Sequence, residues 1–152
     1  MPSDHIAVAE LDAPDSVRVW LGSFTAGTRA GTENVPGELF GDVFLSGDPS
    51  GVVSVPRAAF LAALPAREQM FRSAGWKDPE LETARYEPLG EHYGALLTTW
   101  QMSDLEGSGR TVQLRSTFVL RLHDRRAEVV AYLNDQDLRA VLGLDAANPA
   151  RP

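Results

Sequence analysis

Cysteine is absent from the sequence, and histidine occurs only three times. The lack of cysteine excludes disulfide bonds, thiolate metal ligands and a cysteine nucleophile. Zinc and similar metals are held largely by Cys and His, so three scattered histidines do not indicate a metal centre. We therefore expect neither a metal nor a cofactor.

Long apolar runs are also missing. No segment approaches the roughly 18 consecutive apolar residues that a membrane-spanning helix needs. The opening residues, MPSDHIAVAELDAPDS, have neither the basic region nor the apolar region of a secretory signal. We therefore expect a cytoplasmic protein that does not insert into a membrane.

Basic residues are outnumbered by acidic ones. The chain has 14 Lys and Arg against 21 Asp and Glu, which gives a net charge of −7. Nucleic acids and anionic lipid surfaces are bound by clustered Lys and Arg, so we expect neither as a partner. The local motifs of serine hydrolases, P-loop enzymes, dinucleotide-binding enzymes and zinc proteases are absent as well.

The length of 152 residues suits one domain with a real core. We place that domain at residues 14–144. Residues 1–13 and 145–152 show no apolar periodicity, and we expect them to be flexible termini.

The first helix is predicted within residues 13–30. Asp12 or Asp15 is a candidate cap, and Gly27 and Gly31 are candidate stop signals. Four apolar residues fall at the spacing of one helical face: Val17, Trp20, Leu21 and Phe24.

A second, longer helix follows a glycine-rich stretch. That stretch predicts a short helical turn at residues 36–40 and an extended segment at 43–45. The long helix should begin after Ser54 as N-cap and stop at Gly75. Pro65 lies inside it and should kink or split it.

The second half of the chain changes to the period of strands. Strands are predicted at residues 81–90, 93–103, 109–123 and 126–134, followed by a short helix at 137–144. Short links between these strands indicate antiparallel neighbours. Helices packed on one face of an antiparallel sheet make an α+β domain.

At this point the chain resembles the NTF2-like superfamily, and in particular its SnoaL-like members. The resemblance rests on the element order and on three stretches, FLAALPAREQMFRSAG, YGALLTTWQM with GRTVQLRSTFVLRL, and VVAYLNDQDLRAVLGL. It implies a cone in which a curved antiparallel sheet wraps around the N-terminal helix, with further short helices. An apolar pocket would open at one end of that cone.

The resemblance leaves three functions open, because a fold does not fix a function. The first is the binding of a small hydrophobic molecule. The second is an isomerase, cyclase or dehydratase that uses a pocket Asp, with Tyr86 or Tyr132 as hydrogen-bond donor. The third is a non-catalytic interaction module. The resemblance also implies a homodimer formed through the convex face of the sheet.

Three aspartates are candidate catalytic residues. Asp42 lies between apolar neighbours in LFGDVFL and is a candidate base, or else a turn residue. Some SnoaL-like cyclases carry a catalytic Asp before the closing helix, and both Asp135 and Asp137 match that place approximately. In the alternative interpretation, Asn134 or Asp135 caps the closing helix and Asp137 supports its first turn.

The candidate pocket residues are mostly aromatic. Ordinary core packing is the alternative for all of them, because aromatic rings dominate protein cores. Arg115 belongs to the more polar face of its strand, so we expect it on the convex side of the sheet. The predicted lining comprises Trp20, Phe24, Phe40, Phe44, Tyr86, Trp100, Phe118, Tyr132 and Asn134.

Overall fold

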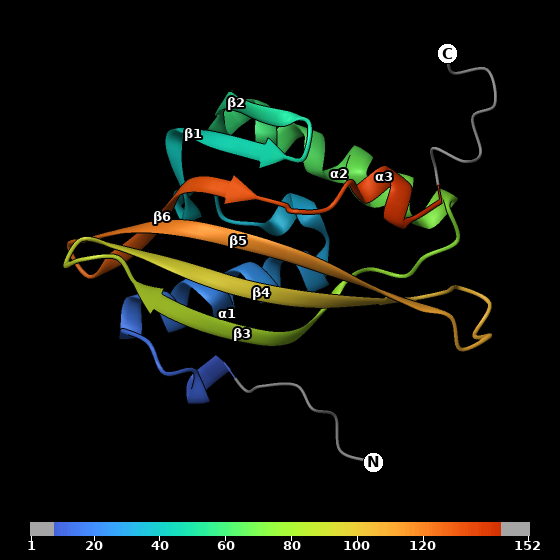
Figure 1. Ribbon diagram of the computed structural model, residues 1–152, viewed down its shortest axis with the longest axis horizontal. Helices are drawn as coiled ribbons and strands as arrows, with labels where there is room; N and C mark the ends of the chain where they lie inside the picture. Colours follow the sequence, from blue (N-terminus) through green and yellow to red (C-terminus); the bar gives the residue numbers. More distant parts are fainter. Residues whose placement is uncertain (1–7, 144–152) are drawn as a thin grey trace.

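The computed structural model describes residues 8–143, which form a curved sheet of six strands with helices on its inner side (Figure 1). The helices are α1 (Asp15–Ala30), α2 (Arg57–Ser73) and α3 (Leu138–Val141), with 3-10 turns η1 (Val8–Glu10), η2 (Thr32–Asn34) and η3 (Gly37–Leu39). The strands are β1 (Phe40–Asp48), β2 (Gly51–Pro56), β3 (Glu80–Pro88), β4 (Tyr93–Ser103), β5 (Thr111–His123) and β6 (Arg126–Leu133). The four strands predicted in the second half are confirmed at nearly the predicted bounds.

The sheet is mixed rather than purely antiparallel. Its strand order is β2-β1-β6-β5-β4-β3, and every neighbouring pair is antiparallel except β1 with β6. That parallel pairing places Phe40 beside Val129 and Leu45 beside Ala131. Turn signals in the sequence report only on strands that follow one another, so this long-range contact was not predicted.

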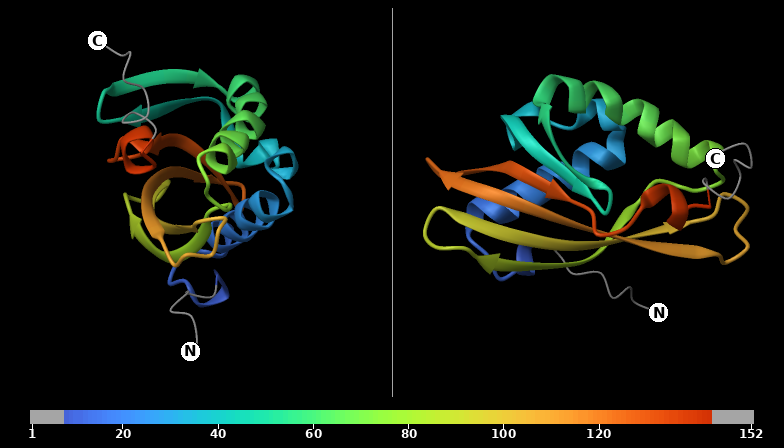
Figure 2. Two further views of the ribbon diagram at one scale, coloured as in Figure 1. Left: turned by 90° about the vertical axis from the view of Figure 1, so that its right-hand side faces the viewer. Right: turned by 45° about the horizontal axis from the view of Figure 1, so that its top comes forward.

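Irregular pairing bends the sheet into the predicted cone. The register shifts between Leu81 and Thr83 in β3, between Val119 and Leu120 in β5, and within β1. Such bulges bend a strand and increase its twist. The strands therefore wrap around an inner side that α1 and α2 occupy (Figure 2).

Helix α1 buries the stripe that its sequence predicts. Val17, Trp20 and Leu21 are buried, and Phe24 is partly buried. The indole N–H of Trp20 donates to the carbonyl oxygen of Leu39 at 2.9 Å. This bond ties α1 to the turn that precedes β1.

Neither long helix begins at the predicted cap. The N-cap position of α1 is Pro14 rather than Asp12 or Asp15, and that of α2 is Pro56, while Ser54 lies in β2. Proline has an extended ψ at both places and no side-chain cap bond is made. The fixed φ of proline can lead the chain into a helix without a side-chain cap bond.

Two further helix predictions need correction. Gly27 lies inside α1, which ends only at Gly31. Of the two predicted effects of Pro65, the split is not found, because α2 runs without interruption to Ser73, and the kink stays a prediction. A proline removes one helical N–H, and the packing of Leu64 and Phe71 into the core keeps the helix together around it.

The segment before α1 is packed, in contrast to our expectation for residues 1–13. Leu11 is only 3% exposed and joins the core. Arg18 of α1 donates to the carbonyl oxygen of Leu11 at 3.0 Å, which holds this segment against the helix. The rest of the predicted termini, residues 1–7 and 145–152, lies outside the described residues.

The outer face of the sheet is the more polar one, as predicted. Along β5, Leu114, Phe118 and Leu120 are buried, whereas Arg115 and Arg121 are exposed. None of the helices within residues 8–143 is long and apolar enough to cross a membrane.

Candidate functional site

Aromatic rings fill much of the inner side of the sheet. Trp20 lies 4.8 Å from Phe118, and both Phe40 and Phe44 lie 5.0 Å from Phe60, measured between ring centroids. Trp20, Phe40 and Phe44, which we predicted as pocket residues, are not among the residues that line the cavity described below. Neighbouring rings cover them, so they belong to the filled core.

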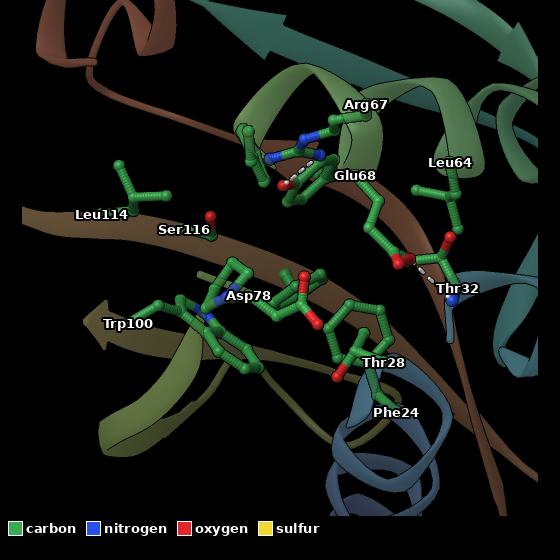
Figure 3. A pocket seen from close by; sticks show the side chains of 14 residues that line it. Phe24, Thr28, Thr32, Leu64, Arg67, Glu68, Asp78, Trp100, Leu114 and Ser116 are labelled. Atoms are coloured by element: carbon green, nitrogen blue, oxygen red, sulfur yellow. Dashed lines mark hydrogen bonds between the residues drawn. The ribbon is translucent and has the colours of Figure 1, made fainter. Parts of the chain in front are cut away.

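An unfilled cavity of about 80 Å³ remains beside this cluster, between α1, α2 and the strands β4 to β6 (Figure 3). Four of the predicted pocket residues do line it, namely Phe24, Trp100, Phe118 and Tyr132. Five aromatic rings and two leucines make most of its wall: Phe24, Phe71, Trp100, Phe118, Tyr132, Leu64 and Leu114.

One wall of the cavity is polar. Arg67 reaches from α2 and donates from Nη1 to the phenol oxygen of Tyr132 at 3.1 Å (Figure 3). Ser116 Oγ donates to Oδ1 of Asn134 at 2.6 Å, and both side chains also hydrogen-bond with the Tyr132 hydroxyl. The guanidinium of Arg67 lies 5.4 Å from the ring centroid of Phe71 and 5.8 Å from that of Tyr132. The wall thus joins a cation to a buried phenol.

The electrostatics of this wall act on Tyr132. Burial by itself raises the pKa of a phenol, because the phenolate loses its hydration. The positive charge of Arg67 and the hydrogen bonds with Ser116, Arg67 and Asn134 act in the opposite direction. Together they outweigh burial and hold the pKa of Tyr132 below its ordinary value.

We expect an alkaline titration, followed by the ultraviolet absorbance of phenolate, to detect Tyr132 early. It should ionise before Tyr86, because burial raises the pKa of Tyr86. Tyr132→Phe should remove the early transition, and Arg67→Met should move it to higher pH by removing the cation. An early transition that survives Tyr132→Phe would contradict this assignment.

The two carboxylates of the cavity are already engaged. Asp78 accepts from Arg72 at two positions, from Nη2 at 2.8 Å and from Nε at 3.3 Å. Glu68 accepts from the backbone N–H of Thr32 at 3.0 Å, and its second oxygen lies 3.6 Å from Arg72 Nη2. These contacts fasten α2 to η2 and to the segment before β3. Within residues 8–143, no group of acidic and histidine side chains is arranged to hold a metal ion.

A second hollow, of about 350 Å³, adjoins the cavity. Arg29, Arg72 and Lys77 contribute to its wall. The two spaces share four lining residues, Thr28, Asp78, Pro79 and Trp100. The two hollows therefore border one another at these four residues.

The candidate acids Asp42 and Asp135 lie outside the cavity. The Asp42 side chain is 89% exposed, and its carboxylate lies 3.1 Å from Arg57 Nη2. Asp135 lies on the outer side of the sheet, 3.4 Å from Arg115 Nη2. Alternation alone would put Asp42 on the face of the buried Phe40 and Phe44, but the irregularity of β1 between Phe40 and Leu45 breaks that alternation and leaves Asp42 exposed.

The polar residues after β6 make hydrogen bonds that hold the end of the chain in place. Asp137 is the N-cap of α3 and accepts from the backbone N–H groups of Arg139 at 3.0 Å and Ala140 at 3.4 Å. The cap is thus Asp137 itself, not Asn134 or Asp135. Gln136 accepts from the backbone N–H of Arg115 at 2.8 Å, so its side chain continues the pairing with β5.

Two more predicted pocket residues have other places. Asn134 accepts a hydrogen bond from Ser116. It borders a groove on the outer face of the sheet and does not line the cavity. Tyr86 lies over Gly94 of the neighbouring strand, where an added Cβ would overlap its hydroxyl oxygen. The absence of a side chain at Gly94 gives the Tyr86 ring its space there.

The polar residues that line the cavity were missed in the sequence. Thr28, Thr32, Glu68 and Asp78 carry no local signal that separates them from other surface residues. Arg67 did carry one. It occupies the same helical face as Phe60, Leu64 and Phe71, at spacings of four, three and four residues, and a cation on an apolar stripe is unusual.

Comparison with solved structures identifies the architecture. A protein of unknown function with a cystatin-like fold from Nostoc punctiforme superposes with a TM-score of 0.60 at 10% identity, over 80% of this chain and 89% of that one. An NTF2-like protein with a cystatin-like fold from Novosphingobium aromaticivorans gives 0.59 at 14% identity, over 84% and 86%. This chain has the NTF2-like fold.

The NTF2-like fold predicted from the resemblance is thus confirmed. A ketosteroid isomerase-like protein from Erwinia carotovora is also similar, with a TM-score of 0.58 at 9% identity, over 82% of this chain and 95% of that one. No family model and no curated protein matches the sequence. At such identities the shared property is the fold, and the function has to be argued from the site.

Proposed function

We propose that this NTF2-like domain binds a small, largely apolar molecule in the cavity between α1, α2 and the sheet. The observation that carries the proposal is an unfilled space lined by five aromatic rings, with the Arg67 and Tyr132 pair at one wall. Apolar pockets with a few convergent polar groups are the usual form of small-molecule sites.

The size of the cavity limits the ligand. Its 80 Å³ is little more than half the volume of an engineered apolar cavity of about 150 Å³ that takes up benzene. A ligand of this site is therefore either very small or extends into the adjoining hollow at Thr28 and Trp100.

Closing the boundary between the two hollows tests this proposal. Thr28 lies on α1 and lines both of them, so Thr28→Leu should block access. Ala26→Leu is the matched control, because Ala26 is exposed on the same helix and lines neither hollow. With toluene and hexanamide as probes, saturation-transfer NMR should show binding to the wild type and to Ala26→Leu but not to Thr28→Leu. Equal signals from both variants, or none from the wild type, would reject the site.

Catalysis has less support in this geometry than binding. An acid–base enzyme needs a carboxylate and a second polar group that converge on one ligand atom. Asp42 and Asp135 lie outside the cavity. Glu68 and Asp78 line it, but both are held by Arg72. Binding is therefore the function that we favour.

We further propose that a second copy of the chain covers the outer face of the β1–β2 hairpin. Val43, Leu45 and Val52 are 58%, 48% and 58% exposed. Val52 pairs with Gly47, so all three lie on the face opposite the buried Phe44. Exposed apolar residues gathered in this way are typical of interaction surfaces.

Light scattering tests the dimer. At tens of micromolar, we expect about twice the 16.5 kDa chain mass. Leu45→Lys should give the monomer mass, because burial of an unpaired ammonium opposes association. Val19→Lys is the control, since Val19 is 67% exposed on α1, away from the hairpin. A monomeric wild type would reject the proposal.

A further inference from the structure

Arg67 is a partly buried cation on an apolar face of α2. It shares a face of α2 with Leu64 and Phe71 and lines the cavity. Within residues 8–143, no carboxylate forms an ion pair with its guanidinium, since the neighbouring acids Glu68 and Asp78 pair with Arg72 instead. Withdrawing a charge from water costs free energy unless an opposite charge compensates it. The cavity thus contains a positive charge without its counterpart.

Most of the hydrogen-bonding capacity of Arg67 is also unused. A guanidinium has five N–H groups, and the one bond made in the described part of the chain runs from Nη1 to Tyr132. Nε is buried without a partner. Nε and Nη2 form one edge of the planar group, and such an edge matches the two oxygens of a carboxylate. The rings of Phe71 and Tyr132 interact with the charge but offer it no such acceptor pair.

We propose, building on the proposed function, that the ligand is a monocarboxylic acid whose carboxylate binds the edge of Arg67 formed by Nη2 and Nε. Its apolar body would lie against Phe24 and Trp100. Because Nε is covered by neighbouring atoms, the carboxylate meets Nη2 first, and a second bond to Nε requires the guanidinium to turn.

The other charges of the cavity restrict the ligand to one negative charge. Glu68 and Asp78 line the same space, and although Arg72 pairs with both, their carboxylates disfavour more negative charge than Arg67 can compensate, as in a phosphate or a dicarboxylate. An amine would be repelled by Arg67 itself. A neutral ligand would leave the charge of Arg67 uncompensated. A single carboxylate on an apolar body satisfies all of these conditions.

The adjoining hollow carries charges of both signs in its wall. Within the described residues, neither Arg29 nor Lys77 of its wall forms an ion pair, whereas Arg72 is neutralised by Asp78 and Glu68. The chain as a whole carries a net charge of −7. The wall also contains Glu80, and two carboxylates face the single charge of Arg72, so the charges around this hollow nearly balance and do not by themselves select an anion.

A pair of probes with the same body and different charge tests the inference. Hexanoate and hexanamide differ in the carboxylate alone, and their affinities can be compared by isothermal titration calorimetry. We expect the wild type to bind hexanoate at least about 10-fold more tightly, as charge-assisted hydrogen bonds exceed neutral ones. Arg67→Met should abolish that preference and leave hexanamide within about 3-fold of its wild-type affinity. Arg67→Lys should keep part of the preference for hexanoate, because a lysine retains the positive charge but lacks the paired N–H donors of a guanidinium.

Arg57→Met is the matched control, because Arg57 also belongs to α2 but lines neither hollow. It should keep the wild-type preference. Equal wild-type affinities for the two probes would overturn the carboxylate inference while leaving the proposed function intact. Binding of neither probe would overturn both. The wild-type comparison decides the matter even if Arg67→Met does not fold.

Discussion

Replacing Trp20 with alanine should lower the free energy of unfolding by about 3–5 kcal/mol. Trp20 is 1% exposed and lies where α1 meets the sheet, in contact with the rings of Phe24 and Phe118. Its removal leaves a cavity that neighbouring rings cannot fill, because they are fixed by their own packing. It also leaves the carbonyl oxygen of Leu39 without the indole N–H. Urea denaturation followed by circular dichroism measures the change.

Two further variants divide this effect into its parts. Trp20→Phe keeps most of the ring but removes the hydrogen bond to Leu39, and should cost about 1–3 kcal/mol. Val19→Ala changes the exposed residue before Trp20 and should cost less than about 0.5 kcal/mol. A Trp20→Ala protein as stable as Val19→Ala would show that α1 is not anchored in the way described.

Replacing Gly27 with alanine should destabilise the domain by about 1–3 kcal/mol, although alanine is the better helix former. A Cβ at this position would lie 2.9 Å from the Cα of Val35 and 3.0 Å from the carbonyl oxygen of Asn34. Both are backbone atoms, so the contact can be relieved only by moving α1 away from the segment after η2. The same denaturation measurement applies.

Gly22 supplies the opposite case within the same helix. A Cβ there would meet nothing closer than a side-chain carbon of Val8 at 3.9 Å, which is an ordinary contact. Gly22→Ala should therefore stabilise the domain by about 0.5–1 kcal/mol through helix propensity alone. If both alanines stabilise, the close approach at Gly27 is not a real constraint.

The strands and the main helical face could be predicted because each is a repeating pattern. In β5, alternation over many residues separated a polar from an apolar face, which favoured Arg115 on the convex side, and Arg115 is exposed there. Helix starts depend on one or two residues and were less predictable. Ser54 is a good cap by residue type, yet the chain is still in β2 at that point. The parallel contact of β1 with β6 carries no local signal at all.

The candidate site was predictable only on its apolar side. Phe24, Trp100, Phe118 and Tyr132 line the cavity because aromatic residues on the inner face must lie near the centre. The polar side was sought among aspartates, as acids are the usual catalytic groups. The polar wall of the cavity is formed instead around Arg67, which bonds to Tyr132. The signal in the sequence was the position of Arg67 on an apolar face of α2.

The parallel pairing of β1 with β6 has a consequence for the biosynthesis of the chain. Phe40 and Phe44 belong to the first strand made, and Val129, beside Phe40, belongs to the last. At about 5–20 residues per second, the ribosome leaves β1 without this neighbour for several seconds. During that interval the apolar side of the hairpin has no completed sheet to cover it. Expression yield should therefore respond to translation speed and to chaperones more strongly than the stability of the finished fold suggests.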